Sequence, residues 1–145
     1  MNDFRKLSDT MLASPQIGLA DVAAAKALGV TLIVNNRPEG ESDDQVPGAE
    51  IEAAAREAGI DYLAIPITHS GFSHPQVAAL ADALARTTGP VLGYCRSGTR
   101  STLLWALARA SMGDDPEAIA AAAAHAGYDV GPVRPAIDAL AAQSR

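Results

Sequence analysis

Cysteine occurs only once in the 145 residues, as Cys95, so an internal disulfide is excluded. Basic residues are also scarce, because 11 Lys and Arg stand against 17 Asp and Glu and give a net charge of −6. Nucleic-acid and membrane-surface binders need a broad basic field, so we expect neither kind of partner. Residues 1–12 contain no long apolar run, which predicts neither a signal peptide nor a membrane span and favours a cytoplasmic location.

Hydrophobic residues make up 48% of the chain, enough for the core of one domain of this length. No internal repeat and no long Ser/Gly linker divides the sequence, so we expect residues 1–145 to form a single domain. In an acidic protein, a local pair of arginines such as Arg96 and Arg100 indicates a specific anion site.

Predicted strands alternate with predicted helices along the chain. Apolar, often β-branched runs predict strands at residues 30–35, 62–67 and 91–94. Proline at first-turn positions and glycine at stop positions predict helices at residues 19–28 and 47–59, from 75 onward, and at about 99–110, 116–127 and 134–142. This alternation predicts an α/β fold, a three-layer sandwich with a short, mostly parallel sheet.

Ligands of such sheets bind outside the carboxyl ends of the strands. Three segments follow predicted strands: residues 35–41, residues 68–74 and residues 95–100. We therefore expect the functional site where these three loops meet.

The third loop carries the chemistry. Cys95 follows a buried strand directly, and a helix is predicted to begin within the next turn. Such a turn directs backbone N–H groups and a helix N-terminus at an anion, and the same field favours a thiolate. We expect Cys95 to be the nucleophile, Arg100 to offer a two-pronged donor to an oxyanion, and Ser101 to hydrogen-bond the sulfur. The expected anion-binding residues are Arg96, Ser97, Gly98 and Thr99.

Two other interpretations of this loop stay open. An isolated cysteine is most often a buried structural residue, which would make Cys95 a small hydrophobe of the core. The loop would alternatively bind an anion beside an inert cysteine. The order of strand, cysteine, glycine, arginine and helix favours the catalytic interpretation.

The segment Cys-Arg-Ser-Gly-Thr-Arg resembles the active-site loop of single-domain rhodaneses, which reads Cys-Arg-x-Gly-x-Arg. The resemblance implies a sulfane sulfur carried on the cysteine as a persulfide. Cysteine-dependent phosphatases use a related loop with five residues between cysteine and arginine, usually with a histidine before the cysteine. Here four residues intervene and Tyr94 precedes, so the spacing is that of the rhodaneses.

A wider resemblance rests on residues 33–41 (Ile-Val-Asn-Asn-Arg-Pro-Glu-Gly-Glu), residues 65–67 (Ile-Pro-Ile) and residues 89–101. Together they are similar to the bacterial family of beta-lactamase-hydrolase-like, phosphatase-like domains. Members occur alone or fused to persulfide-handling metallo-hydrolases and sulfide-oxidising enzymes. The resemblance implies the fold of dual-specificity phosphatases, which is protein-tyrosine-phosphatase-like.

The choice between sulfur and phosphorus chemistry depends on a general acid. In dual-specificity phosphatases the loop after the Ile-Pro-Ile-like strand supplies an aspartate, whereas residues 68–74 here contain no carboxylate. His69 is a candidate substitute, because an imidazole can donate a proton near neutral pH, but it is equally well an ordinary loop residue. Persulfide transfer needs no such acid.

We therefore expect a thiol-dependent sulfurtransferase of the rhodanese type that moves sulfane sulfur through a Cys95 persulfide. Its donor would be a small anion such as thiosulfate or a persulfide, and with no second cysteine the acceptor must be an external thiol. The alternatives are a phosphatase acting through a Cys95 phosphocysteine and a non-catalytic anion or persulfide sensor.

Two further expectations concern the rest of the site. Arg37 lies after a predicted strand and is expected either to face the Cys95 loop or to pair with neighbouring acids such as Glu39 and Glu41; the acidic run 39–44 is otherwise typical of a solvated loop. His69, His74 and Cys95 lack the spacing of zinc ligands, so no metal and no other cofactor is expected.

Overall fold

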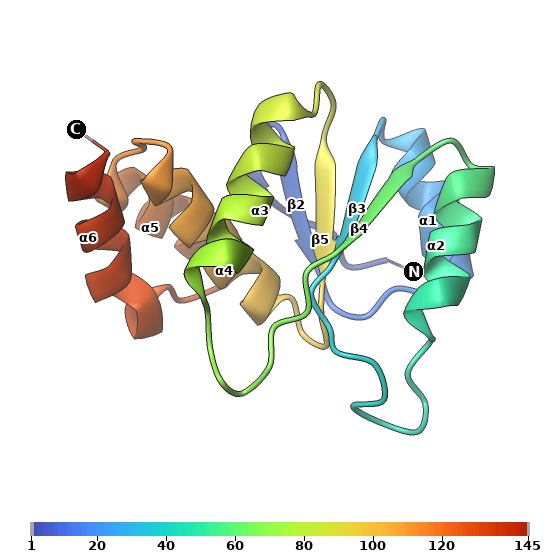
Figure 1. The fold of residues 1–145 in the computed structure, drawn as a ribbon. Helices are drawn as coiled ribbons and strands as arrows, with labels where there is room; N and C mark the ends of the chain where they lie inside the picture. Colours follow the sequence, from blue (N-terminus) through green and yellow to red (C-terminus); the bar gives the residue numbers. More distant parts are fainter. Residues whose placement is uncertain (1, 145) are drawn as a thin grey trace.

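A five-stranded sheet forms the middle layer of the protein (Figure 1). The structure is a computed structural model, and it describes residues 2–144. The strand order is β1-β2-β5-β3-β4. The strands are β1 (Arg5–Ser8), β2 (Met11–Ser14), β3 (Leu32–Asn35), β4 (Asp61–Ala64) and β5 (Val91–Tyr94). Only β1 runs antiparallel to its neighbour, so the predicted mostly parallel sheet is confirmed.

The parallel strands are in register. Val91 of β5 lies opposite both Met11 of β2 and Leu32 of β3, and Leu32 lies opposite Asp61 of β4. Because each of these strands has four residues, all four end at the same edge of the sheet. The residues that follow them therefore gather at one edge, which is where the predicted site was expected.

Helices cover both faces of the sheet (Figure 1). Helices α1 (Leu19–Ala27) and α2 (Gly48–Glu57) pack on one face, and four helices lie on the other side. These four are α3 (His74–Arg86), α4 (Thr99–Ser111), α5 (Pro116–His125) and α6 (Arg134–Gln143), the last preceded by a 3₁₀ turn at Gly131–Val133. Alternate strand residues serve the two cores: Ile33 faces α1 and α2, whereas Leu32 and Val34 face the larger layer.

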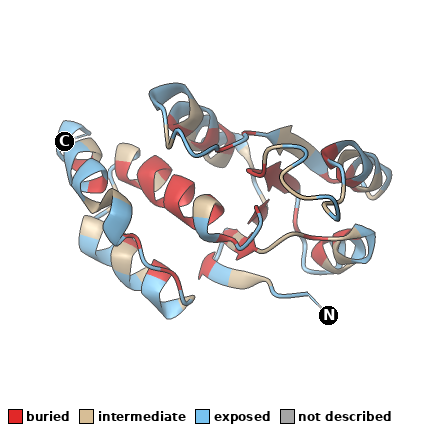
Figure 2. Ribbon diagram, turned by 90° about the horizontal axis from the view of Figure 1, so that it is seen from below, coloured by how far each residue is buried: buried red, intermediate tan, exposed pale blue. Residues whose placement is uncertain are grey.

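Helix α4 is the central element of the larger layer. Nine of its residues are buried, and Figure 2 shows it as the helix most uniformly buried. Its leucines and Trp105 contact core residues of the other three helices in one cluster. Because α4 begins directly after the Cys95 loop, the best-packed helix anchors that loop.

The structure differs from the sequence-based prediction at two points. The sequence pattern predicted no strand in residues 5–14, yet β1 and β2 form there, and β2 fills the sheet position beside β5. The strand predicted at 62–67 is regular only over Asp61–Ala64, because Pro66 has no N–H to donate to a ladder. The backbone of Ile65 and Ile67 nevertheless still donates to Asn35 and Asn36.

Among the helices of residues 2–144, none combines the length and the apolar character required to cross a bilayer.

Candidate active site

The Cys95 loop joins β5 to α4 in four residues. Gly98 is the N-cap of α4 and has a φ of +93°, a left-handed conformation that favours glycine. This turn directs the Gly98 N–H at the Cys95 sulfur, with 3.1 Å between N and Sγ. The Cys95 side chain is fully buried and lies at the N-terminus of α4, whose dipole favours an anion. The predicted tight turn and helix start at the Cys95 sulfur are therefore present.

Ser101 contacts a different partner from the expected one. Its buried hydroxyl donates to Asn36 Oδ1 over 2.8 Å, and Asn36 Nδ2 in turn donates to the Ile65 carbonyl. A hydroxyl has one proton, so in this arrangement Ser101 does not donate to the Cys95 sulfur. Its bond ties the first turn of α4 to the end of β3 instead.

Arg100 points toward the same edge of the sheet and is held by Glu41. Its two terminal nitrogens donate to the two carboxylate oxygens of Glu41, each over 2.8 Å, and Nη1 also donates to the Ile67 carbonyl. Hydrogen bonding to Arg100 lowers the pKa of Glu41 to about 2, against an ordinary value of 4.5, and Arg37 contributes further. The anion-binding fork expected at Arg100 is thus present and occupied by an internal carboxylate.

Arg37 supports this arrangement from behind. Its side chain is only 4% exposed and donates to Glu41 Oε1 at 2.9 Å, to Gln16 Oε1 at 3.0 Å and to Ser42 Oγ at 3.1 Å. Of the two expected roles, pairing with a neighbouring acid is the one observed. The interpretation of the acidic run as a solvated loop is wrong for Glu41, because this side chain folds back over the site between two arginines.

A pocket of about 490 Å³ opens beside these residues. It is lined by Pro38, Glu41, Thr68, His69, Arg96 and Arg100. The three predicted loops therefore meet in one pocket, and His69 and Arg96 are exposed at it. Ser97 and Thr99 are also exposed, but the Ser97 hydroxyl donates to the Thr99 hydroxyl at 3.1 Å and neither side chain lines the pocket. Within residues 2–144, no three side chains of the His, Cys, Asp or Glu types group as a metal site.

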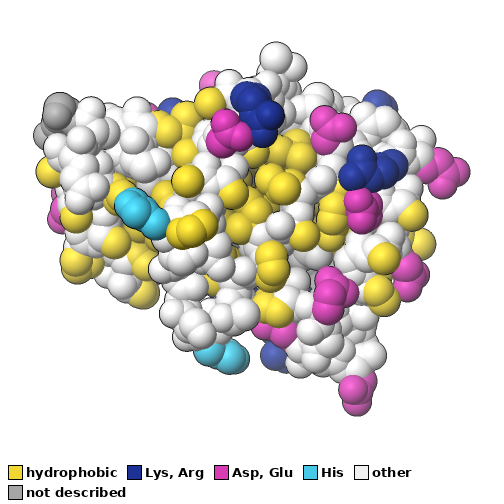
Figure 3. Space-filling model, viewed as in Figure 1, with side chains coloured by type: hydrophobic (Ala, Val, Ile, Leu, Met, Phe, Trp, Pro, Cys, Tyr) yellow, Lys and Arg dark blue, Asp and Glu magenta, His cyan; other side chains and the backbone are white. Residues whose placement is uncertain are grey.

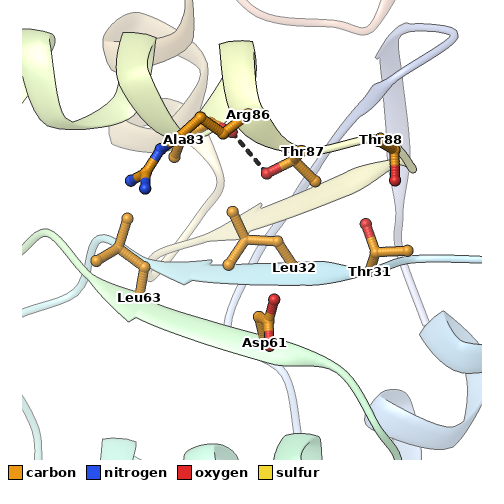
Figure 4. A pocket seen from close by; sticks show the side chains of 8 residues that line it. All are labelled: Thr31, Leu32, Asp61, Leu63, Ala83, Arg86, Thr87 and Thr88. Atoms are coloured by element: carbon orange, nitrogen blue, oxygen red, sulfur yellow. Dashed lines mark hydrogen bonds between the residues drawn. The ribbon is translucent and has the colours of Figure 1, made fainter.

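A second pocket, of about 370 Å³, lies at the opposite end of the strands (Figure 4). Thr31 and Asp61, at the start of β3 and β4, line it together with the last turn of α3. The Thr87 hydroxyl in this pocket donates to the Ala83 carbonyl, as the dashed line in Figure 4 marks. Hydrophobic side chains also gather on this face between α3 and β4 (Figure 3). The pocket holds no thiol and no helix N-terminus, so it does not resemble the Cys95 site.

Three residues of the site had no signal in the sequence pattern. Glu41 was one of several acids in a polar loop, Asn36 was expected only to shape a turn, and Tyr128 had no expected role. The Tyr128 hydroxyl donates to the Ser97 carbonyl at 3.2 Å from 31 residues away. Contacts of this kind depend on how distant segments pack, and local periodicity carries no information about them.

We predict that Glu41→Gln destabilises the protein by about 2 kcal/mol at pH 7, because Arg37 and Arg100 lose a charged partner. The folded-state pKa of Glu41 is lower than its ordinary value, so its contribution exists above about pH 4.5 and disappears as the pH falls toward 2. Denaturant unfolding at several pH values measures this effect. The difference in free energy of unfolding between the variant and the unsubstituted protein should become smaller as the pH falls from about 4.5 toward 2.

Glu52→Gln is the matched control for that measurement. Glu52 pairs with Arg56 on the exposed surface of α2, and such pairs contribute less than about 0.5 kcal/mol. If the two substitutions lowered the free energy of unfolding equally at pH 7, the ion pairs of Glu41 would stabilise the protein no more than an exposed surface pair does.

Comparison with known proteins places this site in a family. The sequence model described as "Beta-lactamase hydrolase-like protein, phosphatase-like domain" matches residues 3–112. A "Beta-lactamase hydrolase-like protein" of Xylella fastidiosa is 39% identical over 109 residues, which cover 71% of this chain and 24% of the relative. The chain thus spans about a quarter of the length of the curated relatives it matches.

Solved structures agree with the fold. A "putative phosphatase" of Neisseria meningitidis is 30% identical with a TM-score of 0.83, over 97% of this chain and 99% of that one. TpbA of P. aeruginosa, solved in complex with pTyr, is 23% identical with a TM-score of 0.66, over 98% and 90% of the two chains. The protein-tyrosine-phosphatase-like fold is therefore confirmed, and the Neisseria relative is described as a phosphatase. Because the family model covers well over half of the sequence, the chain belongs to the family of beta-lactamase hydrolase-like, phosphatase-like domains.

Proposed function

We propose that the chain is a cysteine-dependent phosphatase that hydrolyses phosphate monoesters. The observation that carries the proposal is the Cys95 loop itself: a buried sulfur at the N-terminus of α4, an N–H directed at it, and Arg100 facing the adjoining pocket. Membership of a phosphatase-like family supports phosphate over sulfur as the group transferred. This choice reverses the expectation from the sequence, in which the four-residue spacing and the lack of a carboxylate in residues 68–74 favoured sulfur transfer.

The reaction proceeds in two displacements. The Cys95 thiolate attacks phosphorus, a sulfur–phosphorus bond forms, and the bond from phosphorus to the ester oxygen breaks. The leaving alkoxide takes a proton from an acid or from water. A water molecule then attacks the phosphocysteine, which releases inorganic phosphate and restores the thiolate.

Substrate binding must involve the Glu41 carboxylate. Both terminal nitrogens of Arg100 donate to Glu41, so a phosphate reaches the two-pronged face of Arg100 only by replacing that carboxylate. Arg37 keeps a bond to Gln16 and a bond to Ser42 when Glu41 moves, which limits the cost of the exchange. Arg96, exposed at the same pocket, adds a second positive charge for the incoming anion.

His69 is our candidate for the proton donor, because the loop that supplies an acid in related folds has no carboxylate here and His69 lines the pocket. We predict that His69→Ala slows hydrolysis of an alkyl phosphate by about tenfold to a hundredfold. An aryl phosphate with a good leaving group needs no protonation, so its rate should change by less than about threefold.

His74→Ala is the control for this experiment. His74 is exposed in the same stretch of chain but begins α3 and does not line the pocket that contains His69 and Arg100. If His69→Ala slowed both esters equally, or neither, the proton-donor role of His69 would be wrong.

Sulfur transfer is the second candidate, favoured by the four-residue spacing between Cys95 and Arg100 and by the lack of a carboxylate in residues 68–74. The test uses the intact mass of the protein after exposure to thiosulfate or a small persulfide, alongside assays of phosphate release from aryl phosphates. Phosphate release over many turnovers is the result we expect.

Two other results of that test would indicate sulfur transfer or a non-catalytic sensor instead. Added sulfur on Cys95 that passes to an external thiol such as glutathione, without phosphate release, would replace the proposal by sulfur transfer. Stoichiometric labelling of Cys95 without any turnover would indicate a sensor.

A further inference from the structure

Tyr128 lies outside the residues that the family model matches, yet it contacts the Cys95 loop. It follows Gly127, which ends α5 with a φ of +93°, and its N–H donates to the Ala123 carbonyl at 2.9 Å. The residue is 8% exposed and belongs to the larger core cluster. Its position is therefore set by the end of α5, independently of the loop that it contacts.

The Tyr128 hydroxyl and the Cys95 sulfur contact the two ends of one peptide group. The hydroxyl donates to the Ser97 carbonyl oxygen at 3.2 Å. The nitrogen of the same peptide is that of Gly98, whose N–H donates to Cys95 Sγ at 3.1 Å. In a trans peptide the C=O and the N–H point in opposite directions, so a donor on the oxygen side fixes the direction of the N–H.

We propose that Tyr128 is a positioning residue for the nucleophile, and that its hydroxyl acts through the Ser97–Gly98 peptide to orient and strengthen the N–H that stabilises the Cys95 thiolate. A hydrogen bond to a carbonyl oxygen polarises the amide and makes its N–H a better donor, because successive hydrogen bonds reinforce one another. The inference rests on the proposed role of Cys95 as a thiolate nucleophile. It does not depend on the group that the thiolate attacks.

We call the chain of contacts from the Tyr128 hydroxyl through the Ser97–Gly98 peptide to the Cys95 sulfur the relay. The packing around it permits little variation. A β-carbon at position 98 would collide with the Tyr128 hydroxyl, so glycine is required both for the left-handed turn and for the close approach of the tyrosine. The Arg5 guanidinium lies 5.2 Å from the centroid of the Tyr128 ring and donates to the Ala126 carbonyl, which holds the ring in place. Burial raises the pKa of Tyr128, so its hydroxyl keeps the proton that it donates.

The charged groups on both sides of the relay bear on any titration. Arg96, Arg100 and Glu41 lie on the cysteine side, whereas Arg5 and its partner Asp3 lie on the tyrosine side. None of these five side chains is changed by removing the Tyr128 hydroxyl. A shift in the ionisation of Cys95 in such a variant is therefore assignable to the relay.

The test is Tyr128→Phe, which removes the hydroxyl and keeps the ring. Cys95 is the only cysteine, so its ionisation is followed by thiolate ultraviolet absorbance, each protein being corrected with its own Cys95→Ser counterpart. In Tyr128→Phe we expect the midpoint of the Cys95 titration to lie about half a pH unit higher than in the unsubstituted protein, because the thiolate loses part of its stabilisation. Tyr62→Phe is the matched control: the Tyr62 hydroxyl accepts from Asn35 on the other face of the sheet, and its removal should leave the midpoint unchanged.

An unchanged midpoint in a folded Tyr128→Phe protein would overturn the proposal and reduce Tyr128 to a packing residue. Should that variant fail to fold, nuclear magnetic resonance of the unsubstituted protein provides the test. The Tyr128 Cζ carbon, which carries the hydroxyl, and the Gly98 amide proton should then titrate together with Cys95, and a Tyr128 Cζ signal that stays constant while Cys95 titrates would contradict the role of Tyr128. Neither readout needs a substrate, so an absence of phosphatase activity would refute the proposed function and leave this inference standing.

Discussion

Replacement of Cys95 by serine is expected to reduce the turnover of an aryl phosphate by at least about a thousandfold while the protein stays folded. The serine hydroxyl fits the buried site and still accepts the hydrogen bond from the Gly98 N–H. It remains protonated at neutral pH, however, so the variant has no anion with which to attack the phosphorus atom, as the proposed thiolate would. Initial rates measure the loss of activity, and thermal unfolding of Cys95→Ser and of the unsubstituted protein shows whether the variant stays folded.

Ser111→Ala provides the control, because Ser111 lies at the last turn of α4, away from the loop, and should leave the rate within about twofold. Residual turnover in Cys95→Ser at a rate comparable to that of the unsubstituted protein would falsify the assignment of Cys95 as nucleophile. A loss of both activity and cooperative unfolding would instead point to a structural cysteine, the interpretation that the sequence left open.

Replacement of Arg100 by lysine is expected to lower kcat/KM for the same substrate by about a hundredfold to a thousandfold. Lysine keeps the positive charge but lacks the planar fork that donates to two oxygens at once, as Arg100 does toward Glu41. The loss should appear mainly in kcat, because the charge that attracts the anion is retained whereas the alignment with the transition state is not.

Arg96→Lys is the matched comparison in the same loop. Arg96 is exposed at the pocket, and no hydrogen bond of its guanidinium is found among residues 2–144, so its contribution is that of a charge that lysine also supplies. We expect a change of less than about fivefold. Similar losses for the two substitutions would show that Arg100 contributes charge alone and that its two-pronged geometry has no catalytic role.

The local part of the site was predictable because each signal lies within a few residues. A wholly apolar run, Val91–Tyr94, followed by Cys95 and by Gly98 specifies a buried strand, a tight turn and a helix start, and the structure confirms all three. The strand alternation also predicted that the loops 35–41, 68–74 and 95–100 would meet, because parallel strands end at the same edge. These inferences needed only periodicity, turn chemistry and the handedness of crossovers.

The contacts that tune the site were not predictable in the same way. Glu41 and Arg100 are 59 residues apart, and which of several loop acids folds back depends on the buried Arg37 and its partners. Tyr128 reaches the loop only because α5 ends where it does, beside the N-terminal strand that carries Arg5. The expected bond from Ser101 to the sulfur is absent for the same reason: Asn36, in the loop after β3, accepts the only proton of the Ser101 hydroxyl.

By itself, therefore, the sequence predicted the α/β class and the edge of the sheet at which the three loops meet, and it contains one candidate for a thiolate nucleophile, Cys95. Only the tertiary structure decided that Arg100 is held by Glu41, that Ser101 bonds to Asn36, and that Tyr128 contacts the carbonyl behind the Gly98 N–H. The division has a physical cause. Backbone conformation follows from neighbouring residues through sterics and periodicity, whereas the partner of a charged or polar side chain is set by which distant segments the hydrophobic core brings together.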